Sequence, residues 1–239
     1  MLSLRLGSRV FRPKWLPTLC VLPLLGLLLW LGAWQLHRAD EKQSLYAAFD
    51  KGGGQAVPWL GARSQPRYSH VEVSGHFVAD RQILLDNMSY ADAVGYRVLT
   101  PFVSTDGQWL LVDRGWVPAG THRAKLPDVS VPEENRTVLG RLDELPRPGI
   151  RLGVDEEAGW PRRMNYPTQQ HIQRVLGQTV FAGILRLDAS EPDGYVRDWH
   201  PGGLPPMRHL GYAVQWFALA LTLAVLYIVS QCVRVEPPV

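Results

Sequence analysis

Two long apolar segments without a charged residue lie near the ends of this chain, and they constrain its architecture more than any other feature. They run from Leu16 to Leu36 and from Leu210 to Val233. As α-helices, which rise about 1.5 Å per residue, each extends about 30 Å or more and is long enough to cross the hydrocarbon core of a membrane. We therefore expect a membrane protein of α+β class, with two transmembrane helices that flank a domain outside the membrane.

The apolar segments divide the chain into five expected parts. These are a basic cytoplasmic tail at 1–14, a first transmembrane helix at 15–36, an outward-facing β-rich domain at 37–208, a second transmembrane helix at 209–233 and a cytoplasmic tail at 234–239.

The distribution of charge predicts the topology. Residues 1–14 carry four basic residues and no acidic one, whereas residues 37–208 carry 20 Lys and Arg against 21 Asp and Glu. By the positive-inside rule, the N-terminal tail stays in the cytoplasm, and two crossings return the C-terminus to the same side. The net charge of +3 therefore needs no basic patch to explain it. We expect contact with a lipid bilayer and no nucleic-acid partner.

The N-terminus allows two other interpretations. A cleaved signal peptide would have a shorter apolar run and a clear small-x-small cleavage site, so we interpret the first segment as a retained anchor. A mitochondrial presequence is also basic and free of acids, but this tail is short and contains only Ser3 and Ser8. We expect a bacterial inner membrane, with the mitochondrial inner membrane as the alternative.

Residue patterns in the central domain predict strands. The predicted strands, recognised by alternating or apolar runs, are 68–77, 82–86, 96–104, 108–117, 136–142 and 179–187. Asp106-Gly107 predicts a tight hairpin between two of them. We expect a mostly antiparallel domain, either a small barrel or a sandwich.

Residues that commonly start or stop helices predict the helices and loops of the chain. Residues 37–51 continue the first helix as a polar segment, which ends at Gly52. A short helix is expected between Thr168 and Gly177. Residues 145–167 are rich in Pro, Gly and charge, and they predict a long loop.

Catalytic signatures are absent from the sequence. It contains no Gly-rich nucleotide loop, zinc-protease motif or serine-hydrolase motif. The two cysteines, Cys20 and Cys232, lie in the apolar segments, which leaves the outward domain without thiol chemistry. We therefore expect neither an enzyme nor a copper chaperone.

Two polar pairs, one within a predicted strand and one at the end of another, have a structural interpretation. Asp113 and Arg114 are expected to form buried or semi-buried pairs that hold strand and loop together, with Trp116 in the core. Asp86 and Asn87 are expected to cap a turn after an apolar strand.

Five motifs occur in order along the chain: Gly32–Lys42 (G-x-W-Q-x-x-R-x-x-x-K), Leu84–Asn87, Gly95–Phe102, Leu111–Pro118 and His209–Phe217. Together they resemble the surfeit locus protein 1 family, whose members are assembly factors for haem-copper cytochrome c oxidase. The resemblance implies a protein that helps to insert haem a into oxidase subunit I, with the haem a synthesis machinery as a further candidate partner. For some bacterial members it also implies haem a binding by a histidine at the start of the second helix, which is His209 here.

The residues around His209 fit such a site. Because the helices are antiparallel, residues 34–38 and 208–212 lie at the same membrane depth, and a neutral imidazole is a ligand for haem iron. Tyr212 and Trp216 offer flat surfaces for a macrocycle, and cationic side chains offer partners for propionates. The candidate cofactor-binding residues, with His209 as the axial metal ligand, are His209, Arg38, Lys42, Arg208, Trp34, Gln35, Tyr212 and Trp216.

The same residues also fit a protein that never binds haem. Arg, Lys, His and aromatic residues are common wherever a helix meets a membrane surface. His37 is either a second ligand or an interfacial residue. The alternative function is a haem-free membrane scaffold that stabilises subunit I during assembly.

Overall fold

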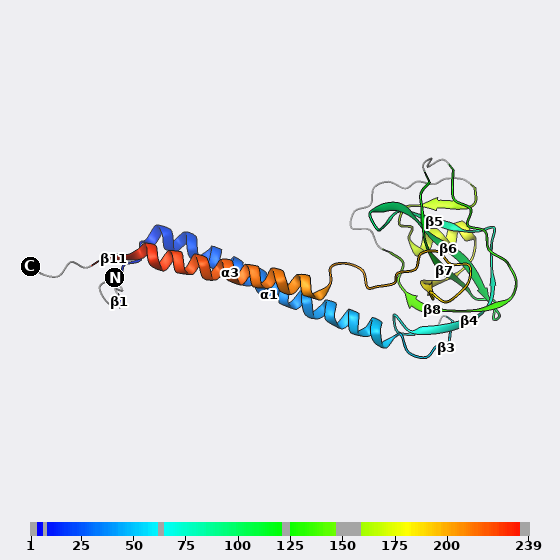
Figure 1. Cartoon of the computed structure of the whole chain (residues 1–239), viewed down its shortest axis with the longest axis horizontal. Helices are drawn as coiled ribbons and strands as arrows, with labels where there is room; N and C mark the ends of the chain where they lie inside the picture. The colour runs from blue at the N-terminus through cyan, green and yellow to red at the C-terminus, as the bar shows by residue number, and fades with distance from the viewer. Residues whose placement is uncertain (1–3, 7–8, 62–64, 121–124, 147–158, 235–239) are drawn as a thin grey trace, which may run out of the picture. The chain divides into compact units, whose positions relative to one another are not determined.

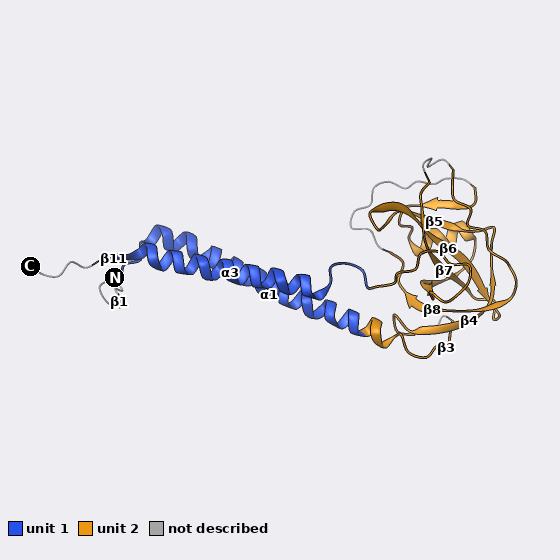
Figure 2. Ribbon diagram, in the orientation of Figure 1, with its two compact units in different colours: residues 1–47, 201–239 blue, residues 48–200 orange. Residues whose placement is uncertain are grey.

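A computed structural model of the chain describes residues 4–6, 9–61, 65–120, 125–146 and 159–234 (Figure 1). The chain divides into two compact units, one formed by residues 1–47 and 201–239 and the other by residues 48–200 (Figure 2). The division falls within the first long helix.

The first unit contains two long helices, α1 (Trp15–Lys51) and α3 (Pro206–Gln231), and both are long and apolar enough to cross a membrane. The polar segment predicted to continue the first helix does so, because α1 is one helix through Lys51. Helix α3 begins with Pro206, whose ring fixes a helical φ and whose missing N–H is not needed in the first turn. Three short strands, which the sequence patterns did not predict, form a small sheet in the order β1 (Leu4–Leu6), β2 (Arg9–Phe11) and β11 (Cys232–Arg234).

Helices α1 and α3 run antiparallel and pack along one seam. Its buried and half-buried residues recur at alternating spacings of three and four, which is the repeat of two packed helices. On α1 they include Thr18, Val21, Leu25, Leu28, Gly32, Gln35, Ala39 and Lys42. On α3 they include Pro206, His209, Ala213, Trp216, Ala220, Leu223 and Tyr227. The hydroxyls of Thr18 and Tyr227, 2.5 Å apart, join the two helices near the chain termini.

The second unit is built on an eight-stranded sheet. Its elements are β3 (Val57–Pro58), β4 (His70–Phe77), β5 (Ile83–Tyr90), β6 (Ala93–Ser104), β7 (Trp109–Pro118), β8 (Arg136–Asp143), β9 (Arg162–Met164), α2 (Gln169–Leu176) and β10 (Val180–Leu187). The strand order is β3-β4-β8-β10-β7-β6-β5-β9. Pairing of β4 with β6 closes five of these strands into a barrel, which decides between the barrel and the sandwich.

Most strand pairs are antiparallel, as predicted, but three are parallel. They are β10 with β7, β3 with β4, and β5 with β9. The β10–β7 pair requires a crossover, and α2 lies in the chain between β9 and β10.

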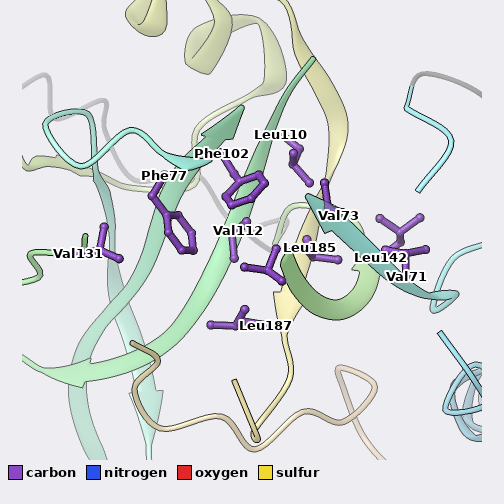
Figure 3. Close-up of a cluster of buried hydrophobic side chains, with 11 residues drawn as sticks. Val71, Val73, Phe77, Phe102, Leu110, Val112, Val131, Leu142, Leu185 and Leu187 are labelled. Atoms are coloured by element: carbon purple, nitrogen blue, oxygen red, sulfur yellow. The ribbon is translucent and has the colours of Figure 1, made fainter. Parts of the chain in front are cut away.

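The barrel interior is an apolar cluster contributed by all five barrel strands (Figure 3). Its buried members are Val71, Val73, Phe77, Phe102, Leu110, Val112, Val131, Val138, Leu142, Leu185 and Leu187. The rings of Phe77 and Phe102 meet edge to face with centroids 5.0 Å apart. Alternation along the strands directs these side chains inward, which explains why the sequence pattern predicted the strands correctly.

Two local predictions are confirmed in detail. The Asp106-Gly107 turn joins β6 and β7, and Gly107 adopts a φ of 75°. Helix α2 begins after Thr168, whose hydroxyl accepts a hydrogen bond from the backbone N–H of His171, and ends at Gly177 in the left-handed conformation. The turn and the two helix ends each depend on residues that are close together in the sequence, which is why the sequence predicts them.

Two other local predictions are wrong. Asp86 and Asn87 do not end a strand, because β5 continues through a bulge between Leu85 and Met88. Asn87 takes a φ of 58° there, and the Asp86 carboxylate accepts its backbone N–H. The expected loop at 145–167 contains β9, which pairs with β5. Residues 147–158 of that loop lie outside the described part of the chain.

Asp113 and Arg114 are both buried but have separate partners. The carboxylate of Asp113 pairs with Arg97 on β6. Arg114 donates to the backbone carbonyls of Val129, Ser130 and Asp193, and it also reaches Gln82 and Thr100. Burial lowers the pKa of Arg114. The prediction that these residues hold strand and loop together is confirmed, although the partners of Arg114 are mainly carbonyl oxygens.

Candidate functional site

The candidate site centres on a hydrogen bond between the two long helices. Nδ1 of His209, in the first turn of α3, lies 2.8 Å from Oε1 of Gln35 on α1. His209 is only 8% exposed, and both residues occupy the helix seam. The sequence analysis named these two residues, and the structure brings them into contact.

Arg38 and its neighbour His37 on α1 share one acidic partner, Glu41. Arg38 pairs with the carboxylate of Glu41, three residues along the helix. Nε2 of His37 lies 3.3 Å from the other oxygen of Glu41, and the His37 side chain is 74% exposed. An incoming anion would therefore compete with Glu41 for Arg38. His37 lies on the exposed side of α1, away from the helix seam.

Lys42 contacts the segment that leads into α3. Its ammonium group donates to the carbonyl of Gly202 over 2.9 Å. Gly203 adopts a φ of 90°, a left-handed conformation that favours glycine, and a Cβ there would lie 2.8 Å from Nζ of Lys42. The lysine thereby fixes the Pro/Gly-rich entry to α3 against α1.

The other predicted site residues are more exposed. Trp34 and Tyr212 expose 47% and 42% of their surface, Arg208 is exposed, and Trp216 is half-buried. Trp216 follows His209 by seven residues and shares its face of α3. The structure therefore brings His209, Gln35 and Trp216 to one seam, while Trp34, Arg208 and Tyr212 face outward.

The donor set of this region fits a single histidine ligand. A neutral imidazole that donates from Nδ1 keeps a lone pair on Nε2, which is the atom available to a metal. Within the described residues, no group of three or more His, Cys, Asp and Glu side chains is arranged to hold a metal ion. A site with one histidine fits a metal that brings most of its other ligands with it, as the porphyrin of a haem does.

Glu41 was missed in the sequence analysis. Its spacing from His37 and Arg38, four and three residues, places all three side chains on one helix face and was a usable signal. The contact between Phe217 and Gly32 was also missed, because it joins residues far apart in the chain and follows no local pattern.

The fold and the site together define a class of proteins in which two antiparallel, membrane-capable helices flank a β-barrel domain and carry a histidine in their seam. A sequence model of the SURF1 family matches residues 22–221, and the chain belongs to this family. The match begins within α1, includes the whole barrel and ends within α3.

Individual relatives support this assignment. A SURF1-like protein of Rickettsia bellii is 27% identical over 216 residues, which cover 84% of this chain and 85% of that protein. A SURF1-like protein of Monosiga brevicollis is 27% identical over 221 residues, which cover 81% and 80%. The cytochrome oxidase assembly protein SHY1 of Saccharomyces cerevisiae is 27% identical over 129 residues, which cover 49% of this chain and 33% of that protein.

Proposed function

We propose that this protein is an assembly factor for haem-copper cytochrome c oxidase, which binds haem a at His209 and aids its insertion into subunit I. Membership of the SURF1 family and the similarity to yeast SHY1 support the assembly role. The contact between His209 and Gln35 is the observation that supports haem binding, because it leaves Nε2 of a neutral imidazole as a ligand atom.

In this proposal the protein lies in a bacterial inner membrane, or in the mitochondrial inner membrane as the alternative. Helices α1 and α3 cross the bilayer, both termini are cytoplasmic, and the barrel domain faces outward. The basic tail at 1–14 supports this orientation. The site then lies where the helices leave the membrane, between the apolar interior and the polar surface.

The residues of the site have distinct proposed roles. His209 ligates the iron, while Tyr212 and Trp216 pack against the porphyrin. Arg38, Lys42 and Arg208 attract the propionates, and Trp34 contacts the macrocycle from α1. A single histidine holds haem a reversibly, which suits handover to subunit I better than a closed site with two protein ligands. The proposal assigns the protein no catalytic step.

The test is purification from cells that also make haem a. The wild-type protein is expected to carry a Soret band, and His209→Ala is expected to lose it. His200→Ala is a matched control, because the His200 side chain is exposed and belongs to the other unit. A wild-type protein without a Soret band would refute haem binding.

The haem-free scaffold is the second candidate function, and the exposed apolar surfaces of α1 and α3 favour it. Such a scaffold would stabilise subunit I through these surfaces. It predicts that subunit I copurifies equally well with wild-type protein and with His209→Ala. Loss of copurification in His209→Ala alone would argue against it.

A further inference from the structure

We infer that Gln35 is a positioning residue that selects the tautomer of His209 and directs its Nε2 as the ligand atom. The inference deepens the proposed function, and its role toward iron rests on that function. The tautomer itself can be measured without haem.

The hydrogen bond between the two side chains determines the proton position. The amide oxygen of Gln35 can only accept, so Nδ1 of His209 must donate across the 2.8 Å contact. A neutral imidazole carries one N–H, and Nε2 therefore keeps its lone pair. The reverse arrangement, in which the Gln35 amide nitrogen donates to Nδ1, would put the proton on Nε2 and block that atom. The two arrangements therefore predict opposite tautomers.

Packing holds the pair in place. Gln35 and His209 both lie at seam positions, and the neighbouring seam residues are Gly32 and Ala39 on α1 and Ala213 on α3. His209 is almost fully buried, so water competes little for its Nδ1. Because the ring nitrogens lie on opposite sides of the imidazole, a bond from Nδ1 to α1 directs Nε2 away from Gln35.

This arrangement matches a general feature of metal sites. A ligating histidine usually donates its other ring N–H to an oxygen acceptor, which fixes the tautomer and raises the basicity of the ligand. Loss of such a partner typically weakens metal affinity by about 10- to 100-fold. Gln35 would thus act on the iron through His209 without touching the macrocycle.

The first experiment uses haem-free, full-length protein with ¹⁵N-labelled histidine in lipid nanodiscs. The chain has seven histidines, and the signals of His209 are those absent from His209→Ala. Wild-type protein is expected to show a protonated Nδ1 and a bare Nε2, and Gln35→Leu is expected to show a mixture of tautomers. Gln215→Leu is the matched control, because Gln215 is exposed on α3. A protonated Nε2 in the wild type, or an unchanged tautomer in Gln35→Leu, would overturn the inference.

The second experiment uses protein reconstituted with haem a. Gln35→Leu is expected to lower affinity by about 10- to 100-fold and to raise the midpoint potential, because a less basic ligand stabilises ferric iron less. Gln35→Glu retains an acceptor oxygen and is expected to keep the potential at or below that of the wild type. Leucine suits an apolar helix seam, and circular dichroism checks that Gln35→Leu remains folded.

The outcomes separate the two proposals. If wild-type protein binds no haem but shows the bare Nε2, haem binding fails while the tautomer selection by Gln35 stands. If wild-type protein binds haem through His209 but Gln35→Leu leaves affinity and potential unchanged, the positioning role fails while haem binding stands.

Discussion

The ring of Phe217 on α3 occupies the space beside Gly32 on α1 that any larger side chain at position 32 would need. A Cβ at Gly32 would lie 2.6 Å from Cε1 of Phe217, well inside van der Waals contact. Gly32 and Gln35 are less than one helical turn apart, so this contact and the His209 hydrogen bond lie in the same region of the seam.

Gly32→Ala is expected to destabilise the helix pair by about 1–3 kcal/mol, because the Phe217 ring must move. Gly26→Ala is the control, since a Cβ there meets nothing within 4 Å, and alanine favours a helix by about 1 kcal/mol. Thermal unfolding of the full chain in detergent measures both. In the double variant Gly32→Ala/Phe217→Leu, the smaller side chain should restore most of the loss. Equal changes in thermal stability for Gly26→Ala and Gly32→Ala would show that Phe217 does not restrict the side chain at position 32.

Arg114→Met is expected to cost about 1–3 kcal/mol, because it leaves the buried carbonyl of Val129 without its donor and also removes the bonds to the carbonyls of Ser130 and Asp193. Arg174→Met, at an exposed position of α2, is expected to change stability by less than about 0.5 kcal/mol. Denaturant unfolding of the barrel, followed by tryptophan fluorescence, measures the difference. Similar midpoints for the two variants would show that the Arg114 network is not stabilising.

Thr168→Ala is expected to destabilise α2 by about 1 kcal/mol, because the backbone N–H of His171 loses its acceptor. Thr168→Ser keeps the hydroxyl and should retain most of the stability. Amide hydrogen exchange in α2 is the measurement, and it should be faster in the alanine variant alone. Faster exchange in both variants would point to the threonine methyl group in place of the cap.

Glu191 makes the stability of the folded protein depend on pH, and the direction of that dependence follows from its raised pKa. Burial, with the nearby charge of Asp188, raises the pKa of its carboxyl group in the folded state. Its contribution to stability is therefore present in acid and is lost as the pH rises through the raised pKa. Glu191→Gln should increase the melting temperature at neutral pH, by an equivalent of less than about 1 kcal/mol because the group is partly exposed, and should have little effect in acid. Glu72→Gln, at an exposed position, is the control. A lower melting temperature at neutral pH for Glu191→Gln would contradict this sign.

Glu41→Gln tests the competition for Arg38. Without the ion pair, Arg38 is free to bind a propionate, and the proposed function then predicts an increase in haem a affinity of about two- to fivefold, the range of an exposed ion pair. Asp40→Asn removes a neighbouring exposed charge and is the control. Spectroscopic titration with haem a measures both affinities. A weaker affinity for Glu41→Gln would mean that the ion pair itself forms part of the site.

The sequence alone determined the features that depend on neighbouring residues. Charge-free apolar runs predicted α1 and α3, because helix length and hydropathy are additive along a segment. Alternation predicted the barrel strands, and single residues such as Thr168 and Gly177 placed the ends of α2. The residue types around His209 marked a candidate site, but they did not distinguish a ligand from an ordinary interfacial histidine.

Only the tertiary structure decided the features that join distant residues. Closure of the barrel by β4 and β6, the parallel β10–β7 pair and the bulge at Asn87 all depend on which strands become neighbours. The same holds for Asp113 with Arg97 and for Gln35 with His209, which are 174 residues apart. Such contacts form only when the chain has folded, because their energy depends on burial and geometry that no local pattern specifies.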